Sequence, residues 1–302
     1  MVGRVKLQSE NSRICVLLGC GYTARAIAPS LRSDGFEVLG TTRNPDNFSE
    51  MAAKGVHPLL YQGKITDELR RILSRTTHII SSIPPSQSGD PFISSMQSQF
   101  GKNWSKLLPN IEWAGYLSAT SVYGDRQGKW VFEEELLHPS TNRGKARVIA
   151  ELDWVESGLP VHIFRIAGIY GPARSAFDRI RSGKAKAVIK KGHISNRIHV
   201  HDIATAIAAS INAPAPHAIY NLADDDPCPP QDVLQFAATL LRERAVREVP
   251  FDEADLSDMA RSFYREARRT SNARIKRDLD WYPQYPSYRE GLVSILEGEE
   301  NA

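Results

Sequence analysis

A glycine-rich turn near the start of the chain has the residue types that bind a pyrophosphate. The turn reads Gly19-Cys20-Gly21-Tyr22-Thr23-Ala24; it follows the apolar run 14–18 and opens a helical pattern. In this G-x-G-x-x-A spacing the first glycine allows a tight turn, the second lets backbone N–H groups approach the phosphates, and the alanine permits close packing of helix on strand. The helix N-terminus then stabilises the phosphate charge. Because the spacing stands between a strand and a helix, we expect these six residues to bind a dinucleotide rather than to form an ordinary turn.

The end of the second strand candidate indicates which dinucleotide is bound. An acidic residue there would bind the adenosine ribose 2′-hydroxyl of NAD, but the chain has Thr41-Thr42-Arg43. An arginine suits the additional 2′-phosphate of NADP. The alternative is a solvated surface arginine at the end of a strand. We therefore expect NADP rather than NAD as the cofactor, with Thr42 and Arg43 in its site.

The first half of the chain supplies the elements that must position this turn. Six short apolar segments, each typical of a buried strand, are 14–18, 36–40, 56–61, 77–83, 113–118 and 160–164. Helical patterns lie between them, among them 90–108 and 144–158. This alternation is typical of βαβ units and predicts an α/β protein with a Rossmann-type doubly wound parallel sheet. Pro29 lies inside the first helical pattern, where it removes one backbone hydrogen bond and is expected to kink the helix.

The second half of the chain has clustered basic residues, frequent prolines and a highly charged stretch at 252–280. We expect an NAD(P)-binding core at 12–170 and a smaller C-terminal substrate lobe at 171–302. The lobe is interleaved with the core, because it contributes a strand and a helix near 198–225. His199 and His201 alternate along a strand-like run, and the eight histidines show no metal-binding spacing, so we expect no metal site.

Composition and charge argue against several classes of protein. The 302 residues carry 38 Lys+Arg against 35 Asp+Glu, a net charge of +3, which is small for a dedicated nucleic-acid binder. The three cysteines form no C-x-x-C pair, which fits a reducing compartment. The N-terminus lacks the apolar run of a signal peptide, and no stretch is apolar for long enough to span a membrane. We therefore expect a cytoplasmic protein that binds neither nucleic acid nor membrane.

Four further segments resemble, in the same order, motifs of the extended short-chain dehydrogenase/reductases in the NAD-dependent epimerase/dehydratase superfamily. They are Leu117–Asp125 (LSATSVYGD, similar to SSxxVYGD), Arg165–Pro172 (RIAGIYGP), Arg197–Ala204 (RIHVHDIA) and Tyr220–Leu222 (YNL). With the glycine turn, the resemblance covers about 14–225. The turn, 272–275 and 286–291 are most similar to the atypical, YeeZ-like subgroup. The resemblance implies a nicotinamide-dependent enzyme that is a monomer or a homodimer.

The resemblance also implies site residues outside the glycine turn. The residues expected beside the cofactor are Ser81, Ser82, Ile83 and Ser118. The residues expected to contact the substrate are Tyr170, Arg174 and Arg197.

The residues that transfer protons in this family are absent at the matching positions. The family uses a Tyr-x-x-x-Lys pair together with a serine or threonine that holds the substrate oxygen. Here Arg143 and Arg147 stand at the tyrosine and lysine positions, and Ala119 stands at the serine or threonine position. An arginine cannot act as an acid near neutral pH because its pKa is too high. This departure argues against ordinary dehydrogenase or epimerase chemistry.

Three nearby residues are the catalytic candidates: Thr120, Tyr123 and Arg147. Thr120 is alternatively a strand residue facing the core, and Tyr123 a structural support for the turn after the strand. Arg147 either holds a substrate phosphate or carboxylate or pairs with Glu151 at i,i+4 spacing on the helix surface. These alternatives stay open at the level of the sequence.

Basic residues gather between 174 and 197, where the enzymes that the chain resembles close over their substrate. Such a run attracts an anionic ligand, for example a sugar nucleotide or a phosphorylated metabolite; a solvated loop is the alternative. Two functions follow from these observations. The first is an NADP(H)-dependent oxidoreductase, epimerase or dehydratase that acts on an anionic small molecule with a non-standard active site. The second is a catalytically inactive NADP(H)-binding sensor of the same fold.

Overall fold

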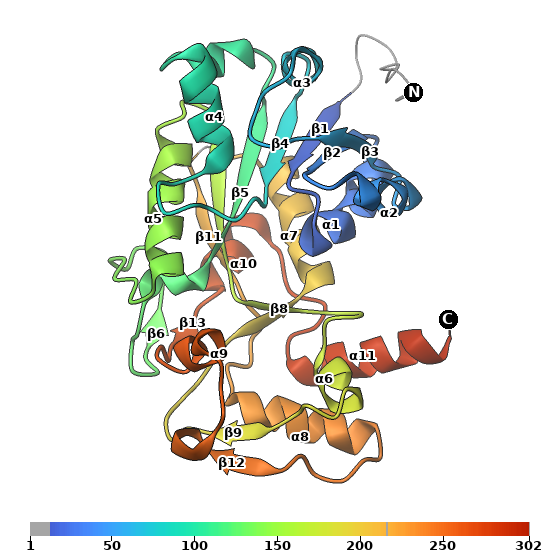
Figure 1. Cartoon of the computed structure of the whole chain (residues 1–302), viewed down its shortest axis with the longest axis vertical. Helices are drawn as coiled ribbons and strands as arrows, with labels where there is room; N and C mark the ends of the chain where they lie inside the picture. The colour runs from blue at the N-terminus through green and yellow to red at the C-terminus, as the bar shows by residue number, and fades with distance from the viewer. Residues whose placement is uncertain (1–12, 216, 302) are drawn as a thin grey trace. The chain divides into compact units, whose positions relative to one another are not determined.

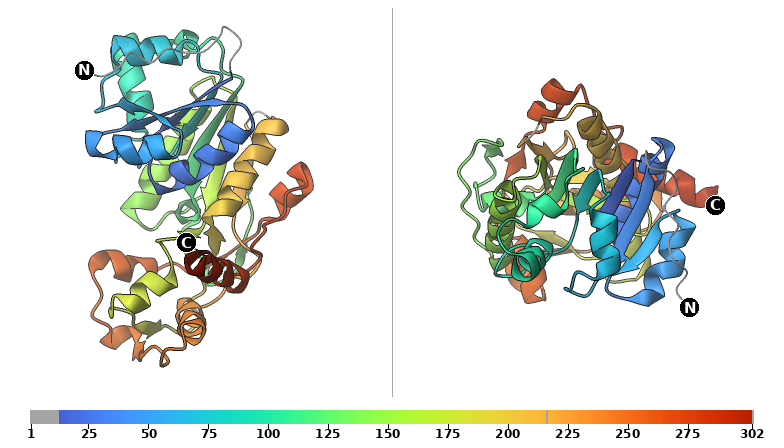
Figure 2. Two further views of the ribbon diagram at one scale, coloured as in Figure 1. Left: turned by 90° about the vertical axis from the view of Figure 1, so that its right-hand side faces the viewer. Right: turned by 90° about the horizontal axis from the view of Figure 1, so that it is seen from above.

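A seven-stranded parallel sheet with helices on both faces is the main feature of the computed structural model, which describes residues 13–215 and 217–301 (Figure 1, Figure 2). Its strand order is β11-β7-β5-β4-β1-β2-β3. The strands are β1 (Ile14–Leu18), β2 (Glu37–Thr42), β3 (His57–Leu60), β4 (His78–Ser81), β5 (Trp113–Ala119), β7 (Val161–Ile166) and β11 (Ile219–Leu222). The strand order reverses at β1, which lies between β2 and β4. This arrangement confirms the predicted Rossmann-type fold, in which ligands bind where the order reverses.

Helices lie between the strands of this sheet, as the alternation of patterns in the sequence predicts. They are α1 (Tyr22–Ser33), α2 (Phe48–Ala53), α3 (Asp67–Leu73), α4 (Pro91–Phe100), α5 (Asn142–Val155) and α7 (Val200–Asn212), with the 3₁₀ turns η1 (Pro45–Asn47), η2 (Trp104–Leu107) and η3 (Thr120–Tyr123). Asn44 caps η1 by accepting from the Asp46 N–H, and Thr66 caps α3 by accepting from the Leu69 N–H. The helix α1 continues across Pro29, which lies on its exposed side.

Two local predictions are wrong. The stretch 90–108 is not one helix, because α4 ends at Phe100 and the φ of 76° at the next residue, Gly101, breaks the helical path before η2 begins. His201 does not lie in a strand: β10 (Arg197–His199) ends at His199 and α7 begins at Val200. The His199 ring accounts for this transition, because its Nδ1 accepts from the His201 N–H at 3.3 Å in the first turn of the helix.

The central strands are apolar along their whole length because they are buried on both faces. All five residues of β1 and all four of β4 are buried, as expected for parallel strands covered by helices. Aromatic side chains fill the space between sheet and helices, and the Phe92 and Trp154 rings stack with centroids 6.2 Å apart. This packing fixes the carboxyl ends of the strands, where the glycine turn lies.

The chain forms two compact units, each assembled from separate segments. Among the described residues, unit 1 contains 13–118, 146–164 and 204–219 without 216, and unit 2 contains 119–145, 165–203 and 220–301. The predicted division at residue 170 assigned 119–145 to the core, whereas these residues cluster with the C-terminal segments. The family motifs after residue 118 therefore belong largely to unit 2.

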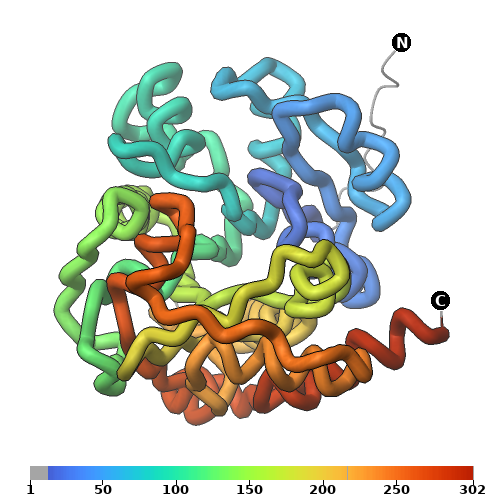
Figure 3. The backbone as a smooth tube through the Cα atoms, turned by 60° about the horizontal axis from the view of Figure 1, so that its bottom comes forward, coloured from blue at the N-terminus to red at the C-terminus, as the bar shows by residue number. Residues whose placement is uncertain are grey.

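Unit 2 is built from short parallel strand pairs and helices. Its remaining elements are β6 (Trp130–Val131), β8 (Gly168–Tyr170), α6 (Ala176–Arg181), β9 (Ala187–Ile189), α8 (Pro230–Leu240), β12 (Glu248–Pro250), η4 (Phe251–Glu253), α9 (Asp258–Phe263), β13 (Arg269–Thr270), α10 (Ala273–Leu279) and α11 (Tyr288–Glu300). The pairs are β8 with β10, β9 with β12 and β6 with β13. Figure 3 shows by colour that β9 and β12, although distant in the sequence, run together.

Candidate functional site

The glycine turn of unit 1 has a backbone that only glycine accommodates at its first position. Gly19 lies between β1 and α1 with a φ of 80°, a conformation that side chains other than glycine rarely adopt. A Cβ atom on Gly19 would lie 2.9 Å from Ile83 Cγ1 and 3.1 Å from the Ile83 backbone nitrogen. The predicted residue Ile83 is thus packed directly on the turn.

Hydrogen bonds from two neighbouring strands hold the turn in place. The Gly19 N–H donates to Thr41 Oγ1 at 2.8 Å, and the Cys20 N–H donates to the Thr41 carbonyl at 2.7 Å. From the other side, Ser82 Oγ donates to the Gly19 carbonyl at 2.5 Å. The sequence placed Ser82 in this site but treated Thr41 only as the end of a strand.

The N-terminus of α1 is open to an anion. Its cap residue is Gly21, so no side chain caps the helix, and no acidic residue lies in the first turn. A Cβ atom on Gly21 would meet nothing within 4 Å, which leaves room for a ligand to approach the backbone. Ala24 is buried against the sheet, whereas Tyr22 and Thr23 are half-buried. These features fit a pyrophosphate bound by backbone N–H groups and the helix dipole.

The segment after β2 presents an unpaired cation. The Thr42 hydroxyl accepts from Asn47 Nδ2 at 3.0 Å and from the Asn44 N–H at 3.2 Å, which shapes this segment. The Arg43 carbonyl accepts from Gln62 Nε2, but the exposed Arg43 guanidinium has no hydrogen-bond or ion-pair partner among the residues that the structure describes. It is therefore available to a phosphate.

Sequence reasoning missed an ion pair beside the turn. Arg25 of α1 pairs with Glu50 of α2, and both charges act on the buried Cys20 thiol. Burial raises the pKa of Cys20 to about 11, so the thiol stays protonated. No spacing rule links Arg25 to Glu50, which lie on different helices.

Two of the residues near the end of β5 are engaged inside unit 1. Ser118 is buried, and its hydroxyl donates to Glu151 Oε1 at 2.6 Å. Arg147 is half-buried, and its guanidinium donates to the Leu117 carbonyl at 2.9 Å. The hydrogen bond from Ser118 thus fixes the Glu151 carboxylate. The hydrogen bond to the Leu117 carbonyl uses only one N–H group of Arg147, so its other N–H groups can bind a ligand.

Thr120 is a hydroxyl residue of unit 2 that remains available for a ligand. It begins η3 and is 8% exposed, and its hydroxyl has no hydrogen-bond partner within 13–215 and 217–301. The neighbouring Ala119, which stands at the family's serine or threonine position, is half-buried and carries no polar group. The structure therefore offers Thr120 as a hydrogen-bonding group one residue away from the usual position.

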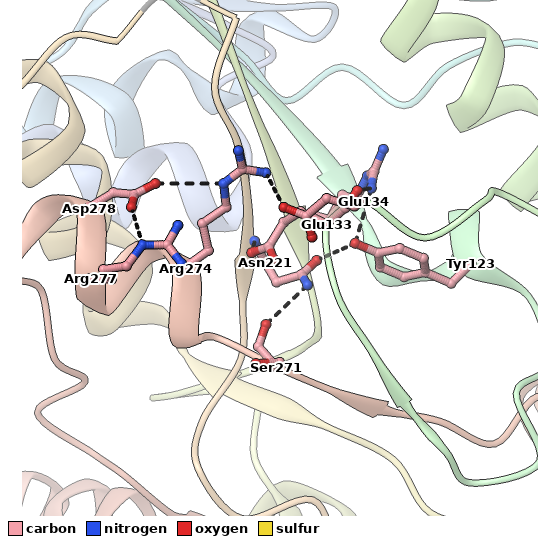
Figure 4. A network of polar contacts seen from close by, with 9 residues as sticks. Tyr123, Glu133, Glu134, Asn221, Ser271, Arg274, Arg277 and Asp278 are labelled. Atoms are coloured by element: carbon pink, nitrogen blue, oxygen red, sulfur yellow. Dashed lines mark hydrogen bonds and ion pairs between the residues drawn. The ribbon is translucent and has the colours of Figure 1, made fainter.

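Tyr123 lies in a buried polar network (Figure 4). Its hydroxyl donates to Asn221 Oδ1 at 2.7 Å and accepts from Arg165 at 3.0 Å. The Asn221 side-chain amide in turn donates to the Ser271 carbonyl at 3.0 Å, and the Asn221 backbone N–H donates to Glu133 Oε1 at 2.8 Å. Burial raises the pKa of Tyr123 to about 12, although Arg165 lowers it. This environment suits a structural group better than a proton donor.

The same network continues to the surface of unit 2. Figure 4 shows Arg274 of α10 between Glu134 and Asp278, with N–O distances of 3.1 and 3.6 Å. The network therefore joins η3, β11 and α10, three elements that are far apart in the sequence.

Two of the predicted substrate residues contact other parts of unit 2. The Tyr170 hydroxyl donates to the Ser287 carbonyl at 3.3 Å and occupies the space where Gly291 of α11 lacks a Cβ. Arg197 donates to Cys228 Sγ at 2.9 Å and to Ser195 Oγ at 3.1 Å. Arg174 is exposed in the turn between β8 and α6. These contacts give Tyr170 and Arg197 positions inside the unit and leave Arg174 on its surface.

Neither a metal cluster nor a membrane span is found in the part of the chain that the structure describes. No group of three or more His, Cys, Asp or Glu side chains within 13–215 and 217–301 could hold a metal ion. No helix in these residues is long and apolar enough to cross a bilayer.

The chain is similar in sequence or structure to several known proteins. No family model matches the chain. Protein YeeZ from Escherichia coli K12 is 30% identical over 217 residues, which cover 68% of this chain and 76% of that protein. The structure of a functionally unknown conserved protein from Silicibacter pomeroyi DSS is 42% identical, with a TM-score of 0.89 over 95% of this chain and 99% of that one. A dTDP-glucose 4,6-dehydratase from Bacillus anthracis str. Ames, in complex with NAD, has the same fold at 20% identity, with a TM-score of 0.70 over 96% and 98% of the two chains.

Proposed function

Because the chain belongs to the YeeZ-like branch of the NAD-dependent epimerase/dehydratase superfamily, we propose that it is an NADP(H)-binding enzyme with a non-standard active site. Its reaction is an oxidoreduction, or a related epimerisation or dehydration, on an anionic small molecule. The observation that carries the proposal is the glycine turn, held by Thr41 and Ser82 while the N-terminus of α1 stays uncapped. A turn fixed in this way is prepared for a pyrophosphate before the ligand arrives.

Arg43 supports NADP rather than NAD. The guanidinium lies just after β2, where the adenosine ribose is bound in this fold, and it has no partner among the described residues. A bidentate contact with a 2′-phosphate would satisfy it. No acid takes the place of the ribose-binding carboxylate, because the residues there are Thr41, Thr42 and Arg43.

A nicotinamide cofactor supplies hydride transfer when it is bound, and the chain's own residues must hold the substrate. Thr120 donates a hydrogen bond to a substrate oxygen, since its hydroxyl has no partner among the described residues. Arg147 holds an anionic group with the N–H groups that the bond to Leu117 leaves over. Tyr123 does not supply the proton, because a pKa of about 12 makes its phenol a weak acid near neutral pH and its hydroxyl is engaged by Asn221.

Calorimetry with NADPH and NADH tests the cofactor. The expected result is tighter binding of NADPH by at least about tenfold, and loss of that preference in Arg43→Ala, because one charge-assisted contact contributes on the order of 1.5–3 kcal/mol. Arg71→Ala, which removes an exposed arginine from α3 of the same unit, serves as the matched control. Equal affinities for the two cofactors in the wild-type protein would refute the preference.

A second function is an NADP(H)-binding sensor without catalysis. The observation in its favour is the replacement of all three proton-handling positions, by Ala119, Arg143 and Arg147. Mixing the NADPH-loaded protein with carbonyl compounds and sugar nucleotides distinguishes the two functions. Oxidation of NADPH that is lost in Thr120→Val supports the enzyme, whereas tight NADPH binding without oxidation of any compound supports the sensor.

A further inference from the structure

Unit 2 contains a pocket of about 260 Å³ that involves none of the residues discussed as site candidates. Its wall comes from three parts of the chain: the loop after η3 at 125–127, the loop after β9 at 190–193, and the segment between α9 and β13 at 264–267. Only the middle part belongs to the basic run that the sequence singled out.

The charges that line this pocket are mostly positive. Lys190, Lys191 and Arg265 are cations, and Asp125 is the one acid among the lining residues. The Asp125 carboxylate accepts from the Ala267 N–H at 2.8 Å and the Gln127 N–H at 3.1 Å. Burial alone would raise the pKa of Asp125, but these two hydrogen bonds hold that pKa below its ordinary value. The acid is therefore engaged by the backbone, and the pocket keeps an excess of two positive charges.

His193 is the buried polar group of this pocket. The side chain is 3% exposed, and both ring nitrogens lack a hydrogen-bond partner among the described residues. Its ring lies against Tyr264, with centroids 4.8 Å apart. Burial, together with Lys190 and Arg268, lowers the pKa of His193 to about 4, so the ring is neutral at pH 7 and offers one donor and one acceptor. Two unpaired nitrogens at this depth are costly unless a ligand or water pairs with them.

We propose that this pocket binds the phosphoryl group of a small phosphorylated molecule, with Lys190, Lys191 and Arg265 balancing its charge and His193 hydrogen-bonded to one of its oxygens. Anion binding follows from the pocket alone. That the phosphorylated molecule is the substrate rests on the proposed function.

The charge and size of the pocket favour a phosphoryl group over a carboxylate. A phosphate monoester carries a charge of about −1.5 to −2 near neutral pH, which matches the excess of two positive charges, whereas a carboxylate would leave one cation unbalanced. Lys190 Nζ donates to the Tyr264 carbonyl, which positions the ammonium group at the pocket. The volume is slightly below the roughly 300–1,000 Å³ of sites that enclose a whole ligand, so the pocket holds the phosphoryl end of the molecule.

Histidine ring signals in NMR report on this site directly. The protein carries eight histidines, and His193→Gln identifies the signal of interest. Titration with inorganic phosphate is expected to shift this signal with saturation, and acetate is expected to bind at least about tenfold more weakly, because a single charge makes fewer charge-assisted bonds. Lys191→Met and Arg265→Met, both at exposed positions, are each expected to weaken phosphate binding severalfold. Lys184→Met, an exposed lysine of the same basic run outside the pocket, is the matched control.

The titration is repeated with saturating NADPH and in Arg43→Ala, so that phosphate bound at the dinucleotide site is not counted. No shift of the His193 signal, or equal phosphate affinity in Arg265→Met and in the wild-type protein, overturns the pocket whether or not NADPH binds. Loss of NADPH binding with an intact phosphate response leaves the pocket standing and overturns the proposed function alone.

Discussion

The two units differ in how the polar atoms of their family motifs are paired. In unit 1 the glycine turn is held through backbone atoms, by Thr41 and Ser82, and the α1 N-terminus and the Arg43 guanidinium stay available. In unit 2 the motif side chains Tyr123 and Arg197 donate or accept hydrogen bonds within the unit itself. A motif match thus identifies a ligand site only where the polar atoms of the motif are not already paired inside the protein.

Two polar groups of unit 2 that lack a hydrogen-bond partner among the described residues lie away from the positions where the family has its proton-handling residues. Thr120 stands one residue beyond the position where the family has its serine or threonine, and His193 lies in a loop that no motif covers. We expect a protein that keeps the fold but changes the reaction to have its available polar groups at new positions, because the fold does not determine the reaction.

The largest effect is expected from Gly19→Val, which tests whether the turn of unit 1 is fixed by its backbone. The side chain would be strained at a φ of 80° and would collide with Ile83. We expect NADPH affinity to fall by at least about 100-fold and the free energy of unfolding to fall by roughly 2–4 kcal/mol, measured by calorimetry and urea denaturation. Gly298→Ala, at a position with open space, is the control. Unchanged affinity in Gly19→Val would remove the turn from the site.

Tyr123→Phe tests the opposite use of a motif residue in unit 2. The substitution leaves Asn221 Oδ1 and an Arg165 N–H without the phenol oxygen, so we expect a loss of about 1–3 kcal/mol in the free energy of unfolding. NADPH binding should stay within about twofold of the wild-type value. If Tyr123→Phe had normal stability and had lost only turnover, Tyr123 would be catalytic, and the two units would not differ in the way described above.

Acid pH is expected to destabilise both units through buried histidines. Burial lowers the pKa of His78 in unit 1 and of His199 in unit 2 to about 4, whereas an unfolded histidine titrates near roughly 6.5. Their contribution is therefore fully present above about pH 6.5 and is lost as the pH falls toward 4. In His78→Phe, which keeps a ring beside Phe36, we expect the loss of stability between pH 7 and 5 to shrink by on the order of 1 kcal/mol. Identical pH profiles of thermal unfolding for variant and wild type would contradict this assignment.

The smallest effect is expected from Arg25→Met beside the turn. The Arg25 side chain is 21% exposed and that of its partner Glu50 is 59% exposed, so the pair contributes less than about 1 kcal/mol. NADPH affinity should change little, because the turn is held by Thr41 and Ser82 rather than by this pair. A drop comparable with that of Arg43→Ala would add Arg25 to the cofactor site.

The sequence was most informative where local patterns determine structure. Continuous apolar runs identified β1 and β4, and the glycine turn after the first run identified the start of α1. These signals need only neighbouring residues, because burial on both faces of a strand and the conformation of a turn depend on a few positions.

Contacts between distant residues could not be predicted in the same way. Tyr123 and Asn221 are 98 positions apart, and Thr41 reaches Gly19 across 22 positions. Likewise, His193 gave no signal in the sequence, since a single histidine beside two lysines is an ordinary surface pattern until burial removes its partners. Pairing of this kind depends on tertiary structure, which periodicity and spacing do not encode.

The segmental build of unit 2 has a consequence for synthesis on the ribosome. All segments of unit 1 are present once residue 219 has been made, but unit 2 still lacks 220–302 at that point. Tyr170 packs in a cluster with Tyr288, Leu292 and Ile295 of α11, so its apolar surface stays uncovered until α11 has left the exit tunnel. Because domains fold as units during translation, a nascent chain of this protein exposes an incomplete core for the whole interval in which residues 220–302 are added.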